Sequence, residues 1–476
     1  MVATGDATTH TRTDLTAPGA ILLLSCYELG HQPLSLAFPM AVLREAGYDP
    51  AVVDTAIDDL DDATIAAARF VAISVPMHTA LRLGTDLARR IRAINPDVQI
   101  CCYGLYAWLN AGYLLREQFD FAIAGEGEAA LLALVQAIER GDSEPVPGVS
   151  SRTTVAAPVI QRLTLPVPDR SALPETRRYA RLMHDGLAIP AGYTEATRGC
   201  HHTCLHCPVV PVYKGRFFAI PRETVLADIR QQVYGGAGHI TFGDPDFLNG
   251  PTHALRVCRA MYEEFPGITF DFTARIEHLL QHRDLLPEFQ RLGCVFVLTA
   301  VETISDHILA KLDKGHTKQD VVNALAALDD AGITMRPSLL PFTPWTTLDD
   351  YRDLLTFFAE YDLAGSVDPV HFSIRLLVPP GSALLDEPDS AEWLGPLDEA
   401  NFTYTWRNPD PRVDTLQREV SALVERAARD EEDPDSTFAK IVQLAWSMTD
   451  ETPPPFTKQR VRLPGQSPRL SESWFC

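Results

Sequence analysis

The chain has 476 residues, of which 46% are hydrophobic and 22% charged, so its length and composition suit a water-soluble protein of two or three domains. No apolar stretch is long enough to span a bilayer, and the N-terminus lacks a basic and apolar signal pattern, so we expect a cytoplasmic protein with no membrane partner. The formal net charge of −22 disfavours nucleic acid as a partner and favours a small-molecule substrate.

The first part of the chain alternates strand-like and helix-like segments. Residues 1–18 are predicted to form a disordered arm, and residues 19–145 to form the first domain. A short apolar run at 20–25 is typical of a strand buried on both faces. This alternation predicts an α/β, doubly wound, Rossmann-like parallel sheet. The other predicted elements are strands at 50–54, 70–75, 98–103 and 121–124 and helices at 34–46 and 79–94.

Three further segments are predicted after this domain. Residues 146–190 hold many prolines and are predicted to be a linker along the surface. A second series of βα units, at 191–385, predicts a partial (β/α) barrel. Residues 386–476 are rich in proline and partly helical, and we expect a C-terminal extension there.

A cysteine motif follows the first predicted strand of the barrel. Cys200, Cys204 and Cys207 have the spacing C-x-x-x-C-x-x-C. Three thiolates fill three of the four positions of a cubane iron–sulfur cluster and leave one iron open. A structural zinc site needs four ligands in a closed geometry, so this spacing favours the cluster. Three histidines of the same loop could complete a zinc site instead: His201, His202 and His206.

This loop closely resembles the signature loop of the radical S-adenosylmethionine (SAM) enzymes. The resemblance implies a [4Fe-4S] cluster whose open iron is bound by the amino and carboxylate groups of SAM. It also implies that one electron from the cluster cleaves a carbon–sulfur bond of SAM to give a carbon radical. We therefore expect an electron donor as a partner, such as a flavodoxin, a ferredoxin or a reductase.

In this family the SAM contacts should lie at the carboxyl ends of the barrel strands. Gly243 and Asp244 match the turn that grips the SAM amino group, which needs an acceptor; the alternative is a plain Asp-Pro turn. Glu302 would hydrogen-bond the ribose hydroxyls or form a structural salt bridge. The remaining expected contacts are His206 beside the adenine, and Arg275 and Arg336 with the SAM carboxylate.

Two segments of the first domain, 74–79 and 125–128, resemble the cobalamin-binding domain that precedes many radical SAM domains. The loop Asp-x-His-x-x-Gly, whose histidine would ligate cobalt, is absent from residues 26–33. A single glycine, Gly104, stands where relatives have two. Two alternatives remain open: a cobalamin bound without a protein ligand to cobalt, or a degenerate domain that only packs on the catalytic one.

The chain ends at Cys476, after Arg-Leu-Ser-Glu-Ser-Trp-Phe. This end resembles the CUAEP/CCAEP-tail radical SAM (seleno)protein family, whose chains end in Cys-Sec-Ala-Glu-Pro or Cys-Cys-Ala-Glu-Pro. Our hypothesis is that the next codon is UGA, read as selenocysteine; the alternative is an end at this cysteine. A terminal thiol could donate a hydrogen atom, hold a soft electrophile or carry a substrate, so Cys476 is the predicted catalytic residue.

These observations predict a radical SAM enzyme, most simply a transferase, that modifies a small molecule in specialised metabolism. The main prediction is chemistry by a 5′-deoxyadenosyl or 3-amino-3-carboxypropyl radical, with the tail thiol or selenol handling an acceptor such as arsenic. The first alternative is a cobalamin-dependent radical SAM methyltransferase. The second is a non-catalytic iron–sulfur or zinc regulator.

Overall fold

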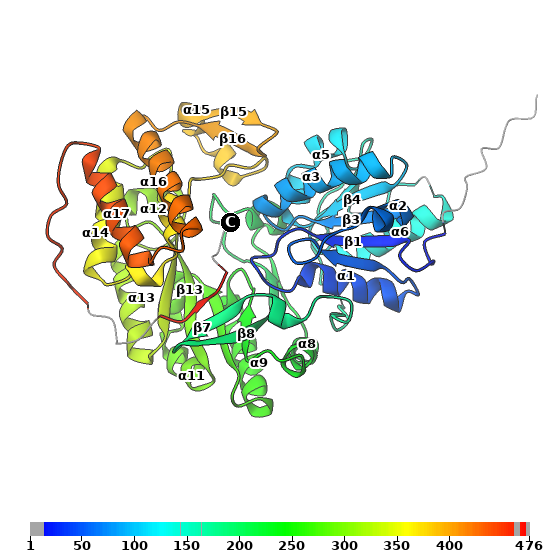
Figure 1. Cartoon of the computed structure of the whole chain (residues 1–476), viewed down its shortest axis with the longest axis horizontal. Helices are drawn as coiled ribbons and strands as arrows, with labels where there is room; N and C mark the ends of the chain where they lie inside the picture. The colour runs from blue at the N-terminus through cyan, green and yellow to red at the C-terminus, as the bar shows by residue number, and fades with distance from the viewer. Residues whose placement is uncertain (1–13, 143, 163, 461–466, 473–476) are drawn as a thin grey trace, which may run out of the picture. The chain divides into compact units, whose positions relative to one another are not determined.

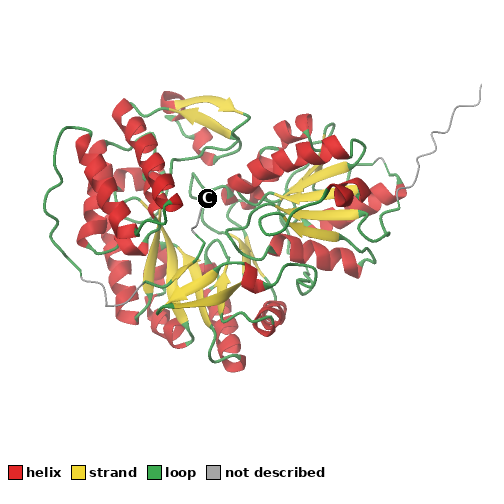
Figure 2. Cartoon of the chain, in the orientation of Figure 1, coloured by secondary structure: helices red, strands yellow, loops and turns green. Residues whose placement is uncertain are grey.

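The structure is a computed structural model that describes residues 14–142, 144–162, 164–460 and 467–472. The chain divides into two compact units, which Figures 1 and 2 show with their helices and strands. Unit 1 comprises Met1–Glu28 and Pro33–Pro174, and unit 2 comprises Leu29–Gln32 and Glu175–Cys476. Within the described part of the chain, no helix has the length and apolar character needed to cross a membrane.

Unit 1 is built on a six-stranded sheet with the order β2-β1-β3-β4-β5-β6. All neighbouring strands are parallel except β6, which is antiparallel to β5. The strands are β1 (Ile21–Ser25), β2 (Ala51–Asp54), β3 (Phe70–Ser74), β4 (Gln99–Tyr103), β5 (Phe121–Ile123) and β6 (Val149–Ser151). The helices are α1 (Leu34–Glu45), α2 (Asp62–Ala67), α3 (His78–Ile94), α4 (Leu105–Leu109), α5 (Ala111–Glu117) and α6 (Glu128–Arg140).

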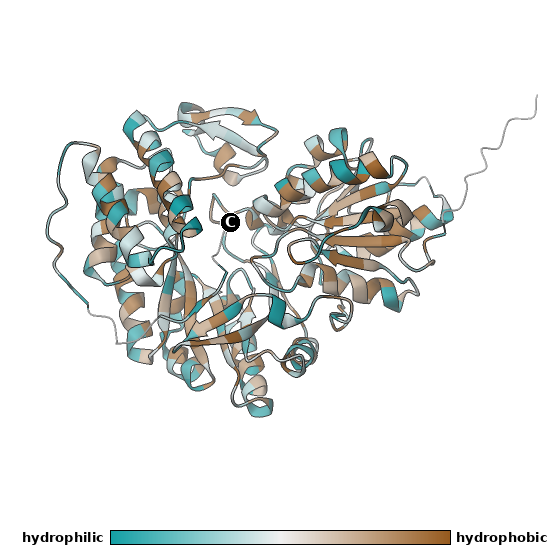
Figure 3. Ribbon diagram, viewed as in Figure 1, coloured by the Kyte–Doolittle hydropathy of each residue, from teal (hydrophilic) through white to brown (hydrophobic). Residues whose placement is uncertain are grey.

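Helices cover both faces of this sheet (Figure 1). Every residue of β1 and β3 is buried, which explains why their sequences are continuously apolar rather than alternating. The strands are mostly brown in Figure 3, while the helices that cover them mix brown and teal. The predicted doubly wound α/β fold is therefore confirmed, with strand ends within one or two residues of those predicted.

The segment 146–190, predicted to be a linker, is divided between the two units. Its first part forms β6, which completes the sheet of unit 1, and its last part supplies strands of unit 2. The many prolines correctly indicated an irregular stretch between these two parts. They did not predict the strands at either end, because the pairing of those strands depends on partners elsewhere in the chain.

Unit 2 is built on a seven-stranded sheet with the order β14-β13-β12-β11-β8-β7-β17. The strands from β8 to β14 are parallel, as in a partial (β/α) barrel, while β7 and β17 add an antiparallel edge. The strands are β7 (Arg181–His184), β8 (Leu187–Thr194), β11 (His239–Phe242), β12 (Thr269–Ala274), β13 (Cys294–Glu302), β14 (Thr334–Leu339) and β17 (Arg469–Leu470). Two hairpins lie outside this sheet: β9 (Thr197–Gly199) with β10 (Phe217–Ala219), and β15 (Leu394–Asp398) with β16 (Thr403–Trp406).

Helices alternate with these strands. Two of them begin with reciprocal capping boxes, Thr317 with Asp320 and Thr347 with Asp350. The segment from residue 374, predicted to be the last barrel strand, makes only an isolated parallel bridge between Arg375 and Phe342. The helices are α7 (Val209–Tyr213), α8 (Arg222–Tyr234), α9 (Pro251–Glu264), α10 (Ile276–Gln281), α11 (Leu286–Arg291), α12 (Asp306–Lys311), α13 (Lys318–Ala331), α14 (Leu348–Glu360), α15 (Ser390–Trp393), α16 (Pro411–Arg429) and α17 (Pro434–Ser447).

Candidate active site

The cysteine loop connects β9 to β10, the two strands of a short hairpin. Gly199 ends β9 with φ +76°, and a Cβ added there would lie 2.4 Å from the carbonyl oxygen of Arg216. The chain can therefore turn out of the hairpin only at a glycine. Within the loop, the Cys207 amide donates to the Cys204 carbonyl at 3.1 Å, and Leu205 N–H donates to Leu312 O at 3.1 Å. These contacts fix the loop against the end of α12.

The three cysteines of the loop are free thiols in this structure. Burial raises the pKa of Cys200 and brings that of Cys207 to about 12, so binding of iron must displace protons from these thiols. Thiolates on one tetrahedral zinc ion lie about 3.8 Å apart. Among the described residues, the three cysteine Sγ atoms do not all lie within 4.8 Å of one another, so at least one pair is farther apart than two ligands of one zinc ion.

Gly243 and Asp244, which directly follow β11, support the polypeptide around the cysteine loop. The buried Asp244 carboxylate accepts from Ala196 N at 2.9 Å and from Thr197 Oγ1 at 2.5 Å, and burial raises its pKa to about 6. A Cβ added at Gly243 would lie 1.9 Å from the Tyr193 hydroxyl. Both residues thus brace β8 and β9, the strands leading to Cys200, and their predicted contacts with SAM stay a prediction.

Glu302, the last residue of β13, lies in a buried charged group. Its Oε1 is 3.0 Å from Lys314 Nζ and 3.4 Å from His206 Nε2. Burial raises the pKa of Glu302, but Lys314 and His206 outweigh it and hold that pKa well below the usual value. The residue has φ +62°, a conformation that side chains rarely adopt and that tends to occur at functional sites. His206 and Glu302, which the sequence predicted separately, therefore meet at one place.

The two arginines predicted to bind the SAM carboxylate have different surroundings. Arg275, which follows β12, donates through Nη2 to the carbonyl of Lys314, and its buried Nε has no hydrogen-bond partner. Arg336 of β14 is buried and pairs with Asp368 at 3.2 Å, and it lies 3.4 Å from the carbonyl of Pro468. Arg275 keeps a donor for a ligand, whereas the described contacts of Arg336 are with the protein itself.

Several buried polar atoms around the strand ends of unit 2 make no well-aligned hydrogen bond in the protein. They include Arg275 Nε, His206 Nδ1 and the ring nitrogens of His316, although His316 also interacts with the Val301 backbone. An unsatisfied buried polar group costs about 1–3 kcal/mol, so such atoms are normally satisfied by a ligand or water. This set fits a polar ligand such as SAM next to the cysteine loop. Lys314 and His316 were missed by the sequence analysis, and the only local signal was the Lys-Gly-His sequence after α12.

Unit 1 offers a second position for a cofactor. The strand order changes direction between β1 and β3, and ligands of doubly wound sheets bind at the carboxyl ends of the strands at that point. Three buried oxygens there make no well-aligned hydrogen bond: Ser74 Oγ, which ends β3, and Glu28 Oε1 and Ser35 Oγ, which follow β1. The Glu28 and Ser35 side chains interact with each other, and Ser74 interacts with Tyr103. Burial raises the pKa of Glu28 to about 7. These residues fit a neutral ligand rich in amides, as the side chains of cobalamin are.

The predicted catalytic residue Cys476 lies outside the described residues. The structure therefore leaves the tail hypothesis as a prediction.

Comparisons with known proteins agree with this geometry. Residues 194–358 match the Radical SAM superfamily, and residues 21–135 match the B12 binding domain. An uncharacterized methyltransferase of Pyrococcus horikoshii is 24% identical over 367 residues, which cover 73% of this chain and 76% of that protein. An anaerobic magnesium-protoporphyrin IX monomethyl ester cyclase of Rubrivivax gelatinosus is 24% identical over 63% of this chain and 57% of its own length.

Two solved structures have a similar fold. The radical SAM methyltransferase TsrM of Kitasatospora setae, solved with tryptophan and a SAM analogue, is 18% identical with a TM-score of 0.59, covering 71% of each chain. The cobalamin-dependent SAM radical enzyme OxsB, solved with aqua-cobalamin and SAM, is 15% identical with a TM-score of 0.67, covering 86% of this chain and 67% of the other.

The fold and the cysteine loop thus define an iron–sulfur enzyme that uses SAM. This chain is a radical SAM enzyme with an N-terminal B12-binding domain. Its cofactors are those of the two domains, a [4Fe-4S] cluster with SAM and a cobalamin. The buried polar atoms that lack a well-aligned hydrogen bond in each unit fit these ligands. The non-catalytic alternative is set aside by this match.

Proposed function

We propose that this protein is a cobalamin-dependent radical SAM methyltransferase that acts on a small molecule. The observation that carries the proposal is the presence of both domains in one chain, matched over residues 21–135 and 194–358. The relative from P. horikoshii, named as a methyltransferase, covers 73% of the chain and therefore extends over more than either domain alone. A bound cobalamin would supply a carrier that takes a methyl group from SAM and passes it to the substrate.

This proposal replaces our main prediction by its first alternative. The main prediction, a 3-amino-3-carboxypropyl or 5′-deoxyadenosyl radical assisted by a tail thiol, depends on Cys476, which lies outside the described residues. The domain composition favours methyl transfer over the aminocarboxypropyl version of that prediction, which gives no role to a B12-binding domain, and the products of SAM distinguish it from the 5′-deoxyadenosyl version. The finer resemblance to the CUAEP/CCAEP-tail family stays a prediction.

In this proposal, different residues of unit 2 bind the cluster and SAM. Cys200, Cys204 and Cys207 hold three irons of the cluster and leave the fourth for the SAM amino acid group. Arg275 Nε and the ring nitrogens of His316 supply unsatisfied polar atoms for that ligand. An electron donor of the flavodoxin, ferredoxin or reductase type would be needed to reduce the cluster. A reducing compartment such as the cytoplasm would keep it intact.

The test uses full-length protein loaded anaerobically with its cluster and with hydroxocobalamin. After gel filtration, it is incubated with SAM and a reductant, and the nucleosides are identified by mass spectrometry. We expect retained cobalamin and formation of S-adenosylhomocysteine, the product that remains when SAM loses its methyl group. The Cys204→Ala variant is the matched control for cluster-dependent products. Methylthioadenosine as the main product would refute methyl transfer and restore the aminocarboxypropyl prediction, and 5′-deoxyadenosine without S-adenosylhomocysteine would restore the 5′-deoxyadenosyl prediction.

A further inference from the structure

Three histidines lie close together, two of them in the cysteine loop and one on α10. His201 and His202 lie between the first two cluster cysteines in sequence, and His278 lies on α10. One ring nitrogen of each lies within 4.8 Å of the others, and the Nε2 atoms of His202 and His278 are 3.1 Å apart. Two imidazole nitrogens bound to one zinc ion, at 2.0–2.1 Å from the metal, are about 3.3 Å apart. The observed spacing is therefore close to that of ligands sharing one ion.

A buried carboxylate lies behind this group. Asp246 Oδ2 is 2.8 Å from His278 Nδ1, but the two are not aligned for a hydrogen bond, and both atoms are buried without such a partner. Asp246 is 0% and His278 3% exposed, so both lie away from bulk solvent. A metal on Nε2 would require Nδ1 to carry the proton and direct it at the carboxylate, the usual arrangement behind metal-bound histidines. The same carboxylate oxygen lies 3.9 Å from His202 Nε2.

Two carboxylates lie beside the rings: Asp246, and Glu277, whose oxygen is 4.0 Å from His202 Nδ1. Glu277 is shared with Arg275, whose Nη2 lies 3.6 Å away, so Asp246 supplies the negative charge on which the site depends. His201 is exposed, so the group is open to solvent on one side and an ion could enter there.

We propose that His201, His202 and His278 bind one divalent transition-metal ion, separate from the cluster, with Asp246 as the residue that positions His278. Imidazole nitrogens suit zinc, and three protein ligands leave a fourth position for water. The ion would tie the cysteine loop to α10, two segments separated by 76 positions between His202 and His278. This site does not depend on methyl transfer.

The experiment measures zinc and iron together in cluster-loaded protein. The protein is equilibrated with Zn²⁺ under anaerobic conditions, freed of unbound metal by gel filtration, and analysed by mass spectrometry for both metals. We expect one zinc per chain in addition to the four irons of the cluster. His201→Ala and His278→Ala should each lose the zinc while keeping the iron, and Asp246→Asn should weaken zinc binding about 10–100-fold in competition with a chelator.

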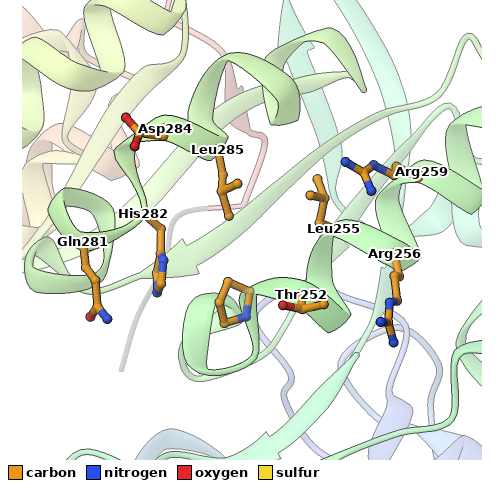
Figure 4. A pocket seen from close by; sticks show the side chains of 9 residues that line it. Thr252, Leu255, Arg256, Arg259, Gln281, His282, Asp284 and Leu285 are labelled. Atoms are coloured by element: carbon orange, nitrogen blue, oxygen red, sulfur yellow. The ribbon is translucent and has the colours of Figure 1, made fainter.

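His282→Ala is the matched control. His282 lies just after α10 and lines a pocket with Gln281, Leu255 and Arg256 (Figure 4). Its ring centroid is 5.9 Å from that of His278, but it is not one of the three clustered ligands, so its loss should leave zinc binding unchanged. The exposed His201 can be replaced with little risk to folding, which keeps the test valid if His278→Ala does not fold. The proposal is overturned if wild-type protein holds no more zinc than His201→Ala, if zinc uptake displaces cluster iron, or if His282→Ala loses zinc as well.

Discussion

Replacing Lys314 by methionine should strongly destabilise unit 2. The Lys314 ammonium is 3% exposed and lies 3.0 Å from Glu302 Oε1, while the Glu302 side chain is 11% exposed. Methionine has a similar length and packs well in an apolar site, so Lys314→Met removes the charge while keeping most of the volume. The Glu302 carboxylate would then remain buried with only His206, at 3.4 Å, beside it.

Removing one partner of a buried ion pair costs about 3–5 kcal/mol, because the other charge is left uncompensated. One kcal/mol shifts the melting temperature of a large domain by about 2–4 °C, so Lys314→Met should melt roughly 10 °C lower. Adding Glu302→Gln removes the unpaired charge of Glu302. The double variant should therefore recover about half of the melting temperature that Lys314→Met loses. In a double-mutant cycle the two residues should couple by at least ~1 kcal/mol.

Differential scanning fluorimetry under anaerobic conditions measures these shifts. Lys458→Met is the matched control: Lys458 pairs with Asp362 at 2.6 Å, but its side chain is 55% exposed, so the change should cost less than about 1 kcal/mol. The ion pair between Lys314 and Glu302 does not stabilise unit 2 if Lys314→Met has the melting temperature of the wild type, or if the double variant is no more stable than Lys314→Met.

Three further predictions concern the other parts of the structure. Cys204→Ala should retain little of the four irons per chain that reconstituted wild-type protein holds; an unchanged iron content would exclude this loop as the cluster site. Gly243→Ala should cost about 1–3 kcal/mol, because its Cβ would meet the Tyr193 ring, whereas Gly267→Ala, with no atom within 4 Å, should be nearly neutral by the same thermal assay. Burial raises the pKa of Glu28 from 4.5 to about 7, so the folded state holds this proton more tightly than the unfolded chain, and stability should fall by up to about 3 kcal/mol between pH 4.5 and 7. Glu28→Gln should abolish that decline in urea unfolding curves, and an unchanged pH dependence would show that Glu28 is not its source.

The parallel strands of the unit 1 sheet could be predicted from local patterns, because buried parallel strands have largely continuous apolar sequences. The linker prediction failed at residues 149–151 and 181–184, which are short strands of mixed composition. Such strands are defined by their partners, β5 and β8, and partners far along the chain leave no local signal.

The cysteine loop stands out in the sequence because its three predicted ligands lie within eight residues of one another. The roles of the acidic residues after β11 were harder to predict from the sequence. Asp244 and Asp246 stand in the same turn, and the sequence cannot show that Asp244 is already satisfied by Ala196 and Thr197 while an oxygen of Asp246 is not. Lys314 was missed for a related reason, since its partner Glu302 is on another element and only the folded chain brings the two charges together.

The pairing of β17 with β7 has a consequence for how the protein is made. The Arg181 amide donates a hydrogen bond to Ser471 Oγ, and the Ser471 amide donates one to the Arg181 carbonyl, across 290 positions in the sequence. During synthesis β7 and β8 leave the ribosome long before residues 469–470, so the outer edge of the sheet stays unpaired while the rest of unit 2 forms. An uncovered strand edge is a template for pairing with other chains. Slow translation of the last helices, or removal of residues 467–476, would therefore favour aggregation of nascent chains before it affected the assembled cluster site.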